Sequence, residues 1–284
     1  MLSIGLSPAE EDKEEIKVLS SASPRKEPKY FVWSWGKNKS GELSHANTAS
    51  SLIPRPVKHL RNKNIINISS GAQHSGAVTD TGILYICGSY LHGKLGIENL
   101  TKVHVTTFQP ITALRGLKVK QVACGDYHTL CLIEDGTVYT WGGSLHKKLG
   151  ARQGGKDFKT PGKIVGLGNN QIKKVACGDF HSIALTVTGK VYSWGGGGSF
   201  FNKGQCGHGH NKDSESPEII KALVNKNVID IVCGGYHTMG LTDSNELYAW
   251  GSGLYGECGF GAFLDLNVPK RVCVSEKNVI VVSS

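Results

Sequence analysis

The sequence predicts an all-β protein, a β-propeller built from four-stranded antiparallel blades. Two short signatures support this prediction, because each recurs at a nearly constant spacing. One of them, called here the second signature, lies at a fixed distance after the other and is found at Gly136–Gly142 (GTVYTWG) and Gly189–Gly195 (GKVYSWG). A period of this length indicates an array of one supersecondary unit. The first signature reads apolar-x-(Cys or Ser)-Gly-x-x-His-(Ser or Thr), and its glycines lie 54, 53 and 56 residues apart: Gly71, Gly125, Gly178 and Gly234.

Each unit contains four short runs that are typical of β-strands. The first run precedes the glycine signature, as at Lys118–Val122. The second begins at the histidine and alternates, so that His128 and Leu130 face one side. A turn with Asp and Gly, Glu134–Gly136, leads to the third run, because Gly accepts the positive φ of a tight hairpin. The fourth run is expected after a proline, as at Pro110, because proline suits an outer strand.

The repeats define one long domain and one short tail. A fifth copy of the second signature begins at Phe31, so we assign residues 30–284 to the propeller repeats. Residues 1–29 lack the repeat and contain the acidic run Glu10–Glu15. Polar, charged segments of this kind are typical of a flexible tail.

The number of repeats leaves the closure of the ring open. Seven blades of this period need roughly 370 residues, and the chain has 284. The last run, Val279–Ser284, aligns with Ile65–Ser70, so the sequence stops before its next Gly-x-x-His. Either about five blades close the ring, or the chain is a fragment of a seven-bladed propeller truncated at the C-terminus. The sequence favours a fragment.

Composition indicates an intracellular protein with a basic surface. The net charge is +9, which attracts polyanions or an acidic protein face. The lysines are scattered over the loops, as is typical of a solvated surface. No signal-peptide core or membrane-spanning run occurs, so we expect no membrane insertion and a cytoplasmic or nuclear location. Cys124, Cys177 and Cys233 recur at one position, too far apart for bridges, so reduced buried thiols are expected.

A third short motif, Gly-(Gln/Lys/Glu)-(Leu/Cys)-Gly, also recurs. Together with the two signatures it resembles the regulator of chromosome condensation (RCC1-like) repeat family. The resemblance covers roughly Tyr30–Ser284. It implies a β-propeller, with seven blades in the founding member, which exchanges guanine nucleotide on the small GTPase Ran and docks on chromatin. Many relatives are binding or scaffold domains. The third step occurs at Gly93–Gly96, Gly204–Gly207 and Gly256–Gly259.

A histidine occupies the same place in four units. One histidine per blade lacks the convergence that zinc requires, so no metal is expected. The favoured role is a structural hydrogen bond that holds the turn of each blade, and contact with a partner is the alternative. These residues are His74, His128, His181 and His237.

Asp126 and Asp179 occupy the second place of two Gly-x-x-His turns. The resemblance implies that these positions, with the four histidines, lie on the face that meets the GTPase in the founding exchange factor. Lys39 stands where the family has a further acid. Alternatively, each aspartate accepts hydrogen bonds within its own turn.

One loop differs from its counterparts. Gly195 to Gly204 spans nine residues where other units take five, and it carries Phe200 and Phe201. The two aromatic rings are candidate anchors for a partner, or they fold back onto the blade. The loop lacks the Gly-Lys-(Ser/Thr) of a phosphate-binding loop.

These features predict a protein-binding scaffold or recognition domain. The alternatives are an exchange factor or binder of a Ran-like small GTPase, and a chromatin-associated protein. No nucleophile–base pair or cofactor fingerprint occurs, so we expect no cofactor and no catalysis beyond nucleotide exchange. Packing within strands, rather than light sensing, is expected for Trp141, Trp194 and Trp250.

Overall fold

The computed structural model describes residues 2–5, 31–151, 156–196 and 198–273. This part of the chain consists of five antiparallel sheets joined by loops and short helical turns. The predicted all-β architecture of antiparallel blades is therefore confirmed. None of the described helices is long and apolar enough to cross a membrane.

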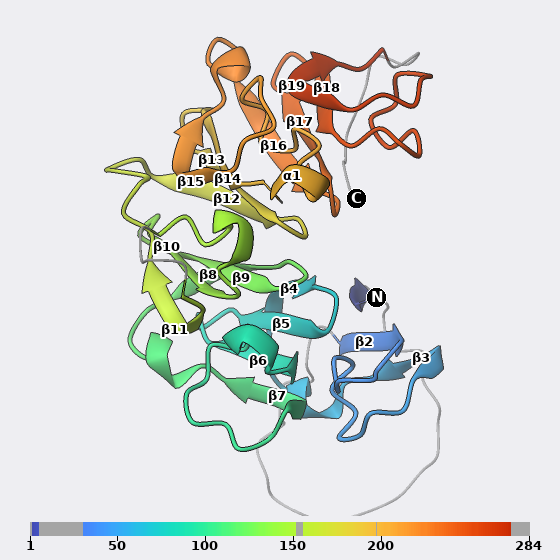
Figure 1. Ribbon diagram of the computed structural model, residues 1–284. Helices are drawn as coiled ribbons and strands as arrows, with labels where there is room; N and C mark the ends of the chain where they lie inside the picture. The colour runs from blue at the N-terminus through green and yellow to red at the C-terminus, as the bar shows by residue number, and fades with distance from the viewer. Residues whose placement is uncertain (1, 6–30, 152–155, 197, 274–284) are drawn as a thin grey trace, which may run out of the picture.

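The sheets follow one another along the chain as blades, numbered here from first to fifth (Figure 1). The first contains β1 (Leu2–Gly5), β2 (Phe31–Gly36) and β3 (Ser51–Pro56). The second contains β4 (Ile65–Ser70), β5 (His74–Thr79), β6 (Leu84–Ser89) and β7 (His104–Pro110). The third contains β8 (Val119–Cys124), β9 (His128–Ile133), β10 (Val138–Gly142) and β11 (Phe158–Lys163).

The fourth blade contains β12 (Ile172–Cys177), β13 (His181–Thr186), β14 (Val191–Gly195) and β15 (Ser214–Ile219). The fifth contains β16 (Val228–Cys233), β17 (His237–Thr242), β18 (Leu247–Gly251) and β19 (Leu266–Arg271). Short helical turns lie between strands: η1 (Lys58–Leu60), η2 (Leu91–Gly93), η3 (Thr112–Leu114), η4 (Leu145–Lys147), α1 (Gly198–Phe201) and η5 (Lys221–Leu223).

The hairpin between the second and third strands of each four-stranded blade has the predicted turn chemistry. Gly82, Gly136 and Gly189 occupy it with φ of 82°, 87° and 76°. In the fifth blade Asn245 takes this place with φ of 64°. Asparagine is one of the few residues with a side chain that visits this left-handed region.

The outer strands lie nearer the N-terminus than predicted. The sequence pattern places them after a proline, but β7 ends on Pro110 and β15 contains Pro217. An outer strand has one neighbour only, so the missing N–H of proline can point to solvent along much of its length. The pairing register also shifts between Ser193 and Gly195, opposite this stretch.

Adjacent blades pack face to face through buried side chains from both sheets. Leu130 and Leu132 of the third blade share a core cluster with Ala184 and Trp194 of the fourth. The indoles of Trp141, Trp194 and Trp250 are all completely buried, which confirms their expected packing role. Hydrophobic burial between sheets therefore holds neighbouring blades together.

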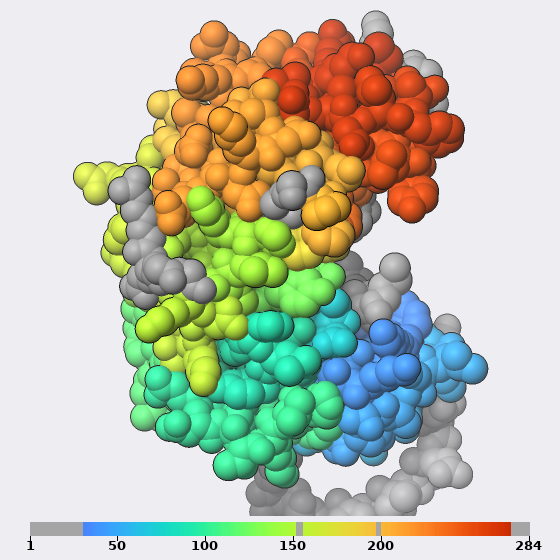
Figure 2. Space-filling model, in the orientation of Figure 1, coloured from blue at the N-terminus to red at the C-terminus, as the bar shows by residue number. Residues whose placement is uncertain are grey.

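The five blades form an arc, with the first and fifth blades at its two ends (Figures 1 and 2). No core cluster of described residues joins these two blades. β1 pairs with β2, at the place that the histidine-bearing strand takes in the other blades. Residues 2–5 thus form a strand, although the sequence pattern places them in the tail. Residues 6–29 of that tail, and the run at 279–284, lie outside the described residues.

Candidate functional site

Three of the recurrent histidines form hydrogen bonds between blades rather than within their own turns. The Nε2 atom of His74 lies 2.8 Å from Oγ1 of Thr129 in the next blade. The same contact, also at 2.8 Å, joins His128 to Ser182 and His181 to Thr238. The three imidazoles are completely buried. The histidine of one signature therefore bonds to the Ser or Thr of the next.

The hydroxyl group fixes the direction of these hydrogen bonds. Thr129 Oγ1 donates its one proton to the carbonyl of Lys94 at 2.8 Å, so it accepts from Nε2–H of His74. The indole Nε1 of Trp141 donates to the same carbonyl at 2.9 Å. Burial lowers the pKa of His74 to about 3, so the imidazole is neutral. We call this set of histidine, hydroxyl, carbonyl and indole the inter-blade bridge.

Burial leaves these three histidines no surface for a partner, so the structure favours the structural role, but across blades. His237 of the fifth blade is half-buried, and burial lowers its pKa while the nearby Glu257 carboxylate raises it. Contact with a partner stays a prediction for His237. Within the described ranges, no group of three or more His, Cys, Asp or Glu side chains could hold a metal ion.

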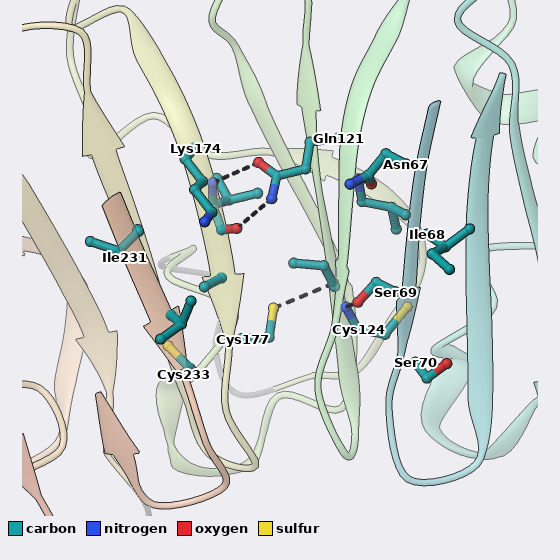
Figure 3. A pocket seen from close by; sticks show the side chains of 15 residues that line it. Asn67, Ile68, Ser69, Ser70, Gln121, Cys124, Lys174, Cys177, Ile231 and Cys233 are labelled. Atoms are coloured by element: carbon teal, nitrogen blue, oxygen red, sulfur yellow. Dashed lines mark hydrogen bonds between the residues drawn. The ribbon is translucent and has the colours of Figure 1, made fainter. Parts of the chain in front are cut away.

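The innermost strands of the second to fifth blades, β4, β8, β12 and β16, line an open central cavity of about 350 Å³ (Figure 3). The side-chain amide of Gln121 exchanges two hydrogen bonds of 2.9 Å with the backbone of Val175 in the next blade. Lys174 and Asp230 form an ion pair between the following two blades. These polar groups satisfy one another across the seams between blades. The cavity is therefore better explained as structure than as a binding site.

Reduced thiols stay the expectation for the cysteines. All eight lie in the described part of the chain and are free; five are buried and two are half-buried. Burial raises the pKa of Cys124, beside the central cavity, to about 12, so it stays protonated at neutral pH. Cys273 differs because it is exposed.

Asp126 and Asp179 lie at the end of the blades that carries the Gly-x-x-His turns, here called the turn face. Burial raises the pKa of both carboxyls, that of Asp179 to about 6. The negative charge of Asp126 also raises the pKa of Asp179, and a hydrogen bond from the Tyr236 hydroxyl opposes both effects. Among the described residues, neither carboxylate accepts a hydrogen bond from its own turn, contrary to the alternative expectation.

Four aromatic rings form a stacked group on the turn face, here called the aromatic strip. Tyr127, Phe180 and Tyr236 hold equivalent places in successive Gly-x-x-His turns, and Phe201 comes from α1. Neighbouring ring centroids lie 5.7 Å (Tyr127–Phe180), 5.2 Å (Phe180–Phe201) and 6.1 Å (Phe201–Tyr236) apart. Tyr127 is 38% exposed and Phe201 46%, so two of the rings present apolar surface to solvent.

Two buried lysines lie against these rings. Lys94 and Lys148 are 2% and 1% exposed, and their Nζ atoms lie 5.9 and 5.5 Å from the Tyr127 centroid. Lys94 Nζ donates to the backbone carbonyl of Asp126 at 3.1 Å. Burial lowers the pKa of Lys148 to about 8, opposed by nearby carboxylates, of which Asp157 has the largest effect. Both lysines favour the ionised form of the Asp126 carboxyl.

The two phenylalanines of the loop Gly195–Gly204 differ: one folds back onto the blade and the other is exposed, and the sequence left both outcomes open. Phe201 folds back onto the aromatic strip, whereas Phe200 is 83% exposed. The side-chain amide of Gln205 donates to the carbonyl of Phe201 at 2.9 Å and fixes the end of α1. The loop therefore adds one ring to the strip and offers one to solvent.

The sequence-based prediction missed the two lysines and the strip. Lys94 and Lys148 follow the strand glycine at the same offset, in a step where other units carry Glu or Gln. This recurrence could have identified the two lysines, because residues at the same offset in two repeats take the same place in their blades. Tyr127 and Tyr236 were visible in the turns, but their stacking depends on the spacing between blades.

Comparisons with known proteins agree with this architecture. A profile of the RCC1-like domain matches residues 31–284. The ultraviolet-B receptor UVR8 of Arabidopsis thaliana is 36% identical over 242 residues, 85% of this chain and 53% of the receptor. The human E3 ubiquitin-protein ligase HERC2 is 36% identical over 246 residues, 85% of this chain and 5% of the ligase. The chain thus spans about half the length of the first relative and a small part of the second.

Solved structures show the same fold. Human WBSCR16 has a TM-score of 0.77 and 25% identity, over 90% of this chain and 65% of that one. Prp20p of Saccharomyces cerevisiae has a TM-score of 0.73 and 21% identity, over 86% of this chain and 59% of that one, a likeness of fold alone. The profile match covers every described strand except β1. The chain therefore belongs to the RCC1-like domain family.

Proposed function

We propose that this chain is a protein-binding propeller that contacts its partner through the turn face. The observation that carries the proposal is the aromatic strip, which exposes Tyr127 and Phe201 beside the carboxylates of Asp126 and Asp179. Aromatic residues are enriched in the centres of protein interfaces, and a few of them supply most of the binding energy.

The turn face is held in place before any partner binds. The inter-blade bridges fix the start of each histidine-bearing strand. Tyr127, Phe180 and Tyr236 each lie directly before such a histidine in the chain, so the bridges hold them in place as well. Stacking and the buried lysines restrict the rings further. A surface that loses little conformational freedom on binding retains more of its interaction energy.

Paired capture experiments test this proposal. One variant carries Tyr127→Ser and Phe201→Ser; its matched control carries Leu52→Ser and Ile53→Ser, which are 97% and 67% exposed on the outer strand β3. We expect proteins that bind the wild-type chain to be retained by the control and lost by the strip variant. Measured pairwise, the affinity should fall about 100-fold or more. Equal binding by both variants would contradict the proposal.

Exchange on, or binding to, a Ran-like small GTPase is the second candidate. The observation that favours it is the position of Asp126 and Asp179, half-buried carboxylates on the turn face. The structural neighbour Prp20p is described by its binding to Gsp1p and histones. An exchange factor needs no nucleophile, because it acts by binding the nucleotide-free GTPase more tightly than the loaded form.

Nucleotide release from a panel of small GTPases, with and without this chain, tests the second candidate. Acceleration that disappears in an Asp126→Ala, Asp179→Ala variant would support it. The matched control is Glu98→Ala with Glu215→Ala, two exposed acids whose loss changes the net charge equally. No acceleration by the folded chain excludes exchange on the GTPases tested. Association with chromatin and an intracellular location stay predictions from the sequence.

A further inference from the structure

A small basic pocket lies on the first blade, away from the turn-face residues described above. It has a volume of about 290 Å³, and its lining includes His45, Arg55, Lys58 and His59 and no carboxylate. Arg55 ends the outer strand β3 together with Pro56, and Lys58 and His59 belong to η1. Two segments that are close in sequence therefore bring three exposed basic side chains to one concavity.

No carboxylate partner of these basic side chains lies in the described part of the chain. Among the described residues, Arg55, Lys58 and His59 form neither an ion pair nor a side-chain hydrogen bond. Within the described residues, the positive charge of the pocket is therefore uncompensated.

One wall of the pocket is rigid. The ring of His45 lies 3.1 Å from Ser34 Oγ, which donates to the carbonyl of Leu43 at 2.8 Å, so the His45 Nε2–H donates to the hydroxyl. The flanking Ser44 has a left-handed φ of 60°, where the second blade has Gly96. The Ser44 side chain has room because the second blade has Cys87 at the position where the other blades have tryptophan.

The other blades act as internal controls for this site. The residue that pairs in register like Arg55 is Gln109 in the second blade, Gly162 in the third, Glu218 in the fourth and Lys270 in the fifth. In place of Lys58 and His59, the equivalent turn begins Thr-Ala after the second blade (η3) and Lys-Ala after the fourth (η5). Single lysines therefore recur at one or other of these positions, but among the described residues only the first blade combines Arg55, Lys58 and His59 there.

We propose that this pocket binds the phosphate group of a phosphorylated serine or threonine on a partner protein. A guanidinium group binds phosphate oxygens with two parallel hydrogen bonds, and a lysine adds a point charge beside it. A nucleic acid would need cations that continue to further phosphates, but the positions equivalent to Arg55, Lys58 and His59 in the adjoining second blade are neutral. Of the exposed cations that follow there, Lys118 is paired with Glu134. A single phosphoryl group fits one isolated concavity better than a phosphate backbone does.

The test is a titration of the full chain with acetyl-phosphoserine amide, followed by phosphorus NMR. The site variant carries Arg55→Gln and Lys58→Gln, and the matched control carries Arg115→Gln and Lys118→Gln, exposed cations of the next connection. We expect the control to bind like wild type and the site variant to bind at least about tenfold more weakly. An Arg55→Lys variant should fall between them, because it keeps the charge and loses the paired hydrogen bonds.

Three results would overturn the proposal. The first is no binding of phosphoserine to the wild-type chain. The second is an equal loss in both double variants, which would indicate diffuse attraction. The third is a short DNA duplex that binds with a steep salt dependence and displaces phosphoserine, which would assign the pocket to nucleic acid. Equal thermal unfolding of the variants confirms that they are folded.

Discussion

The inter-blade bridge makes a quantitative prediction for Thr129. Replacement of Thr129 by Val keeps the shape of the side chain and removes only the hydroxyl. Two hydrogen bonds of 2.8 Å disappear, one from His74 Nε2 and one to the carbonyl of Lys94. The carbonyl keeps the Trp141 indole as a donor, but the buried Nε2–H of His74 has no other partner among the described residues.

The expected loss of stability follows from these contacts. A buried donor left without an acceptor costs about 1–3 kcal/mol, and one further net hydrogen bond costs about 1 kcal/mol. The free energy of unfolding should therefore fall by about 2–4 kcal/mol in Thr129→Val. The matched control is Thr129→Ser, the residue found at this place as Ser182, which keeps the hydroxyl and loses one methyl group, at about 1 kcal/mol.

Urea denaturation measures this difference, provided that the slope against denaturant concentration is unchanged among the variants. Because blades interact mainly with their neighbours, hydrogen exchange should also accelerate in β5 and β9 before other strands. A Val variant as stable as the Ser variant would refute the claim that the hydrogen bonds of the bridge stabilise the fold.

Two further predictions concern the turns between blades and the titration of the turn face. Gly150→Ala should destabilise the fold by more than Gly116→Ala, because both glycines have positive φ but only at Gly150 would a Cβ lie 2.5 Å from the Trp194 indole nitrogen; melting temperatures of the two variants decide this. Burial raises the pKa of Asp179 in the folded chain to about 6, above the ordinary value of 3.8. Its contribution therefore favours folding below pH 4 and is lost as the pH rises through 6. Asp179→Asn should therefore be more stable than wild type at pH 7.5, by about 1–2 kcal/mol after allowance for solvent screening, and the difference should vanish near pH 4.

The sequence predicted the parts of the fold that recur in phase. Repetition placed the inner, second and third strands, because their glycine, histidine and aromatic positions are fixed by turns and burial. It misplaced the outer strand, whose proline occurs at different points of β7 and β15. An edge strand tolerates proline and irregular register, so its bounds leave a weak trace in the sequence.

The candidate site was only partly predictable. The aspartates and the outlier loop were identified, but the histidines were expected to bond within their own turns. Their acceptors lie 54 to 57 positions later in the chain, a distance over which a pattern shows recurrence but not contact. The stacking of Phe201 on Phe180 depends on how a nine-residue loop folds, which no repeat specifies.

Photochemical cross-linking tests the central claim, that the turn face binds a protein partner, most directly. A photoreactive phenylalanine derivative is placed in turn at Tyr127, on the aromatic strip, and at Leu52, on the outer strand β3, and each chain is irradiated in the presence of a captured partner. The proposal predicts a cross-link from position 127 and none from position 52. A partner that binds the chain but cross-links only from position 52 would contradict it.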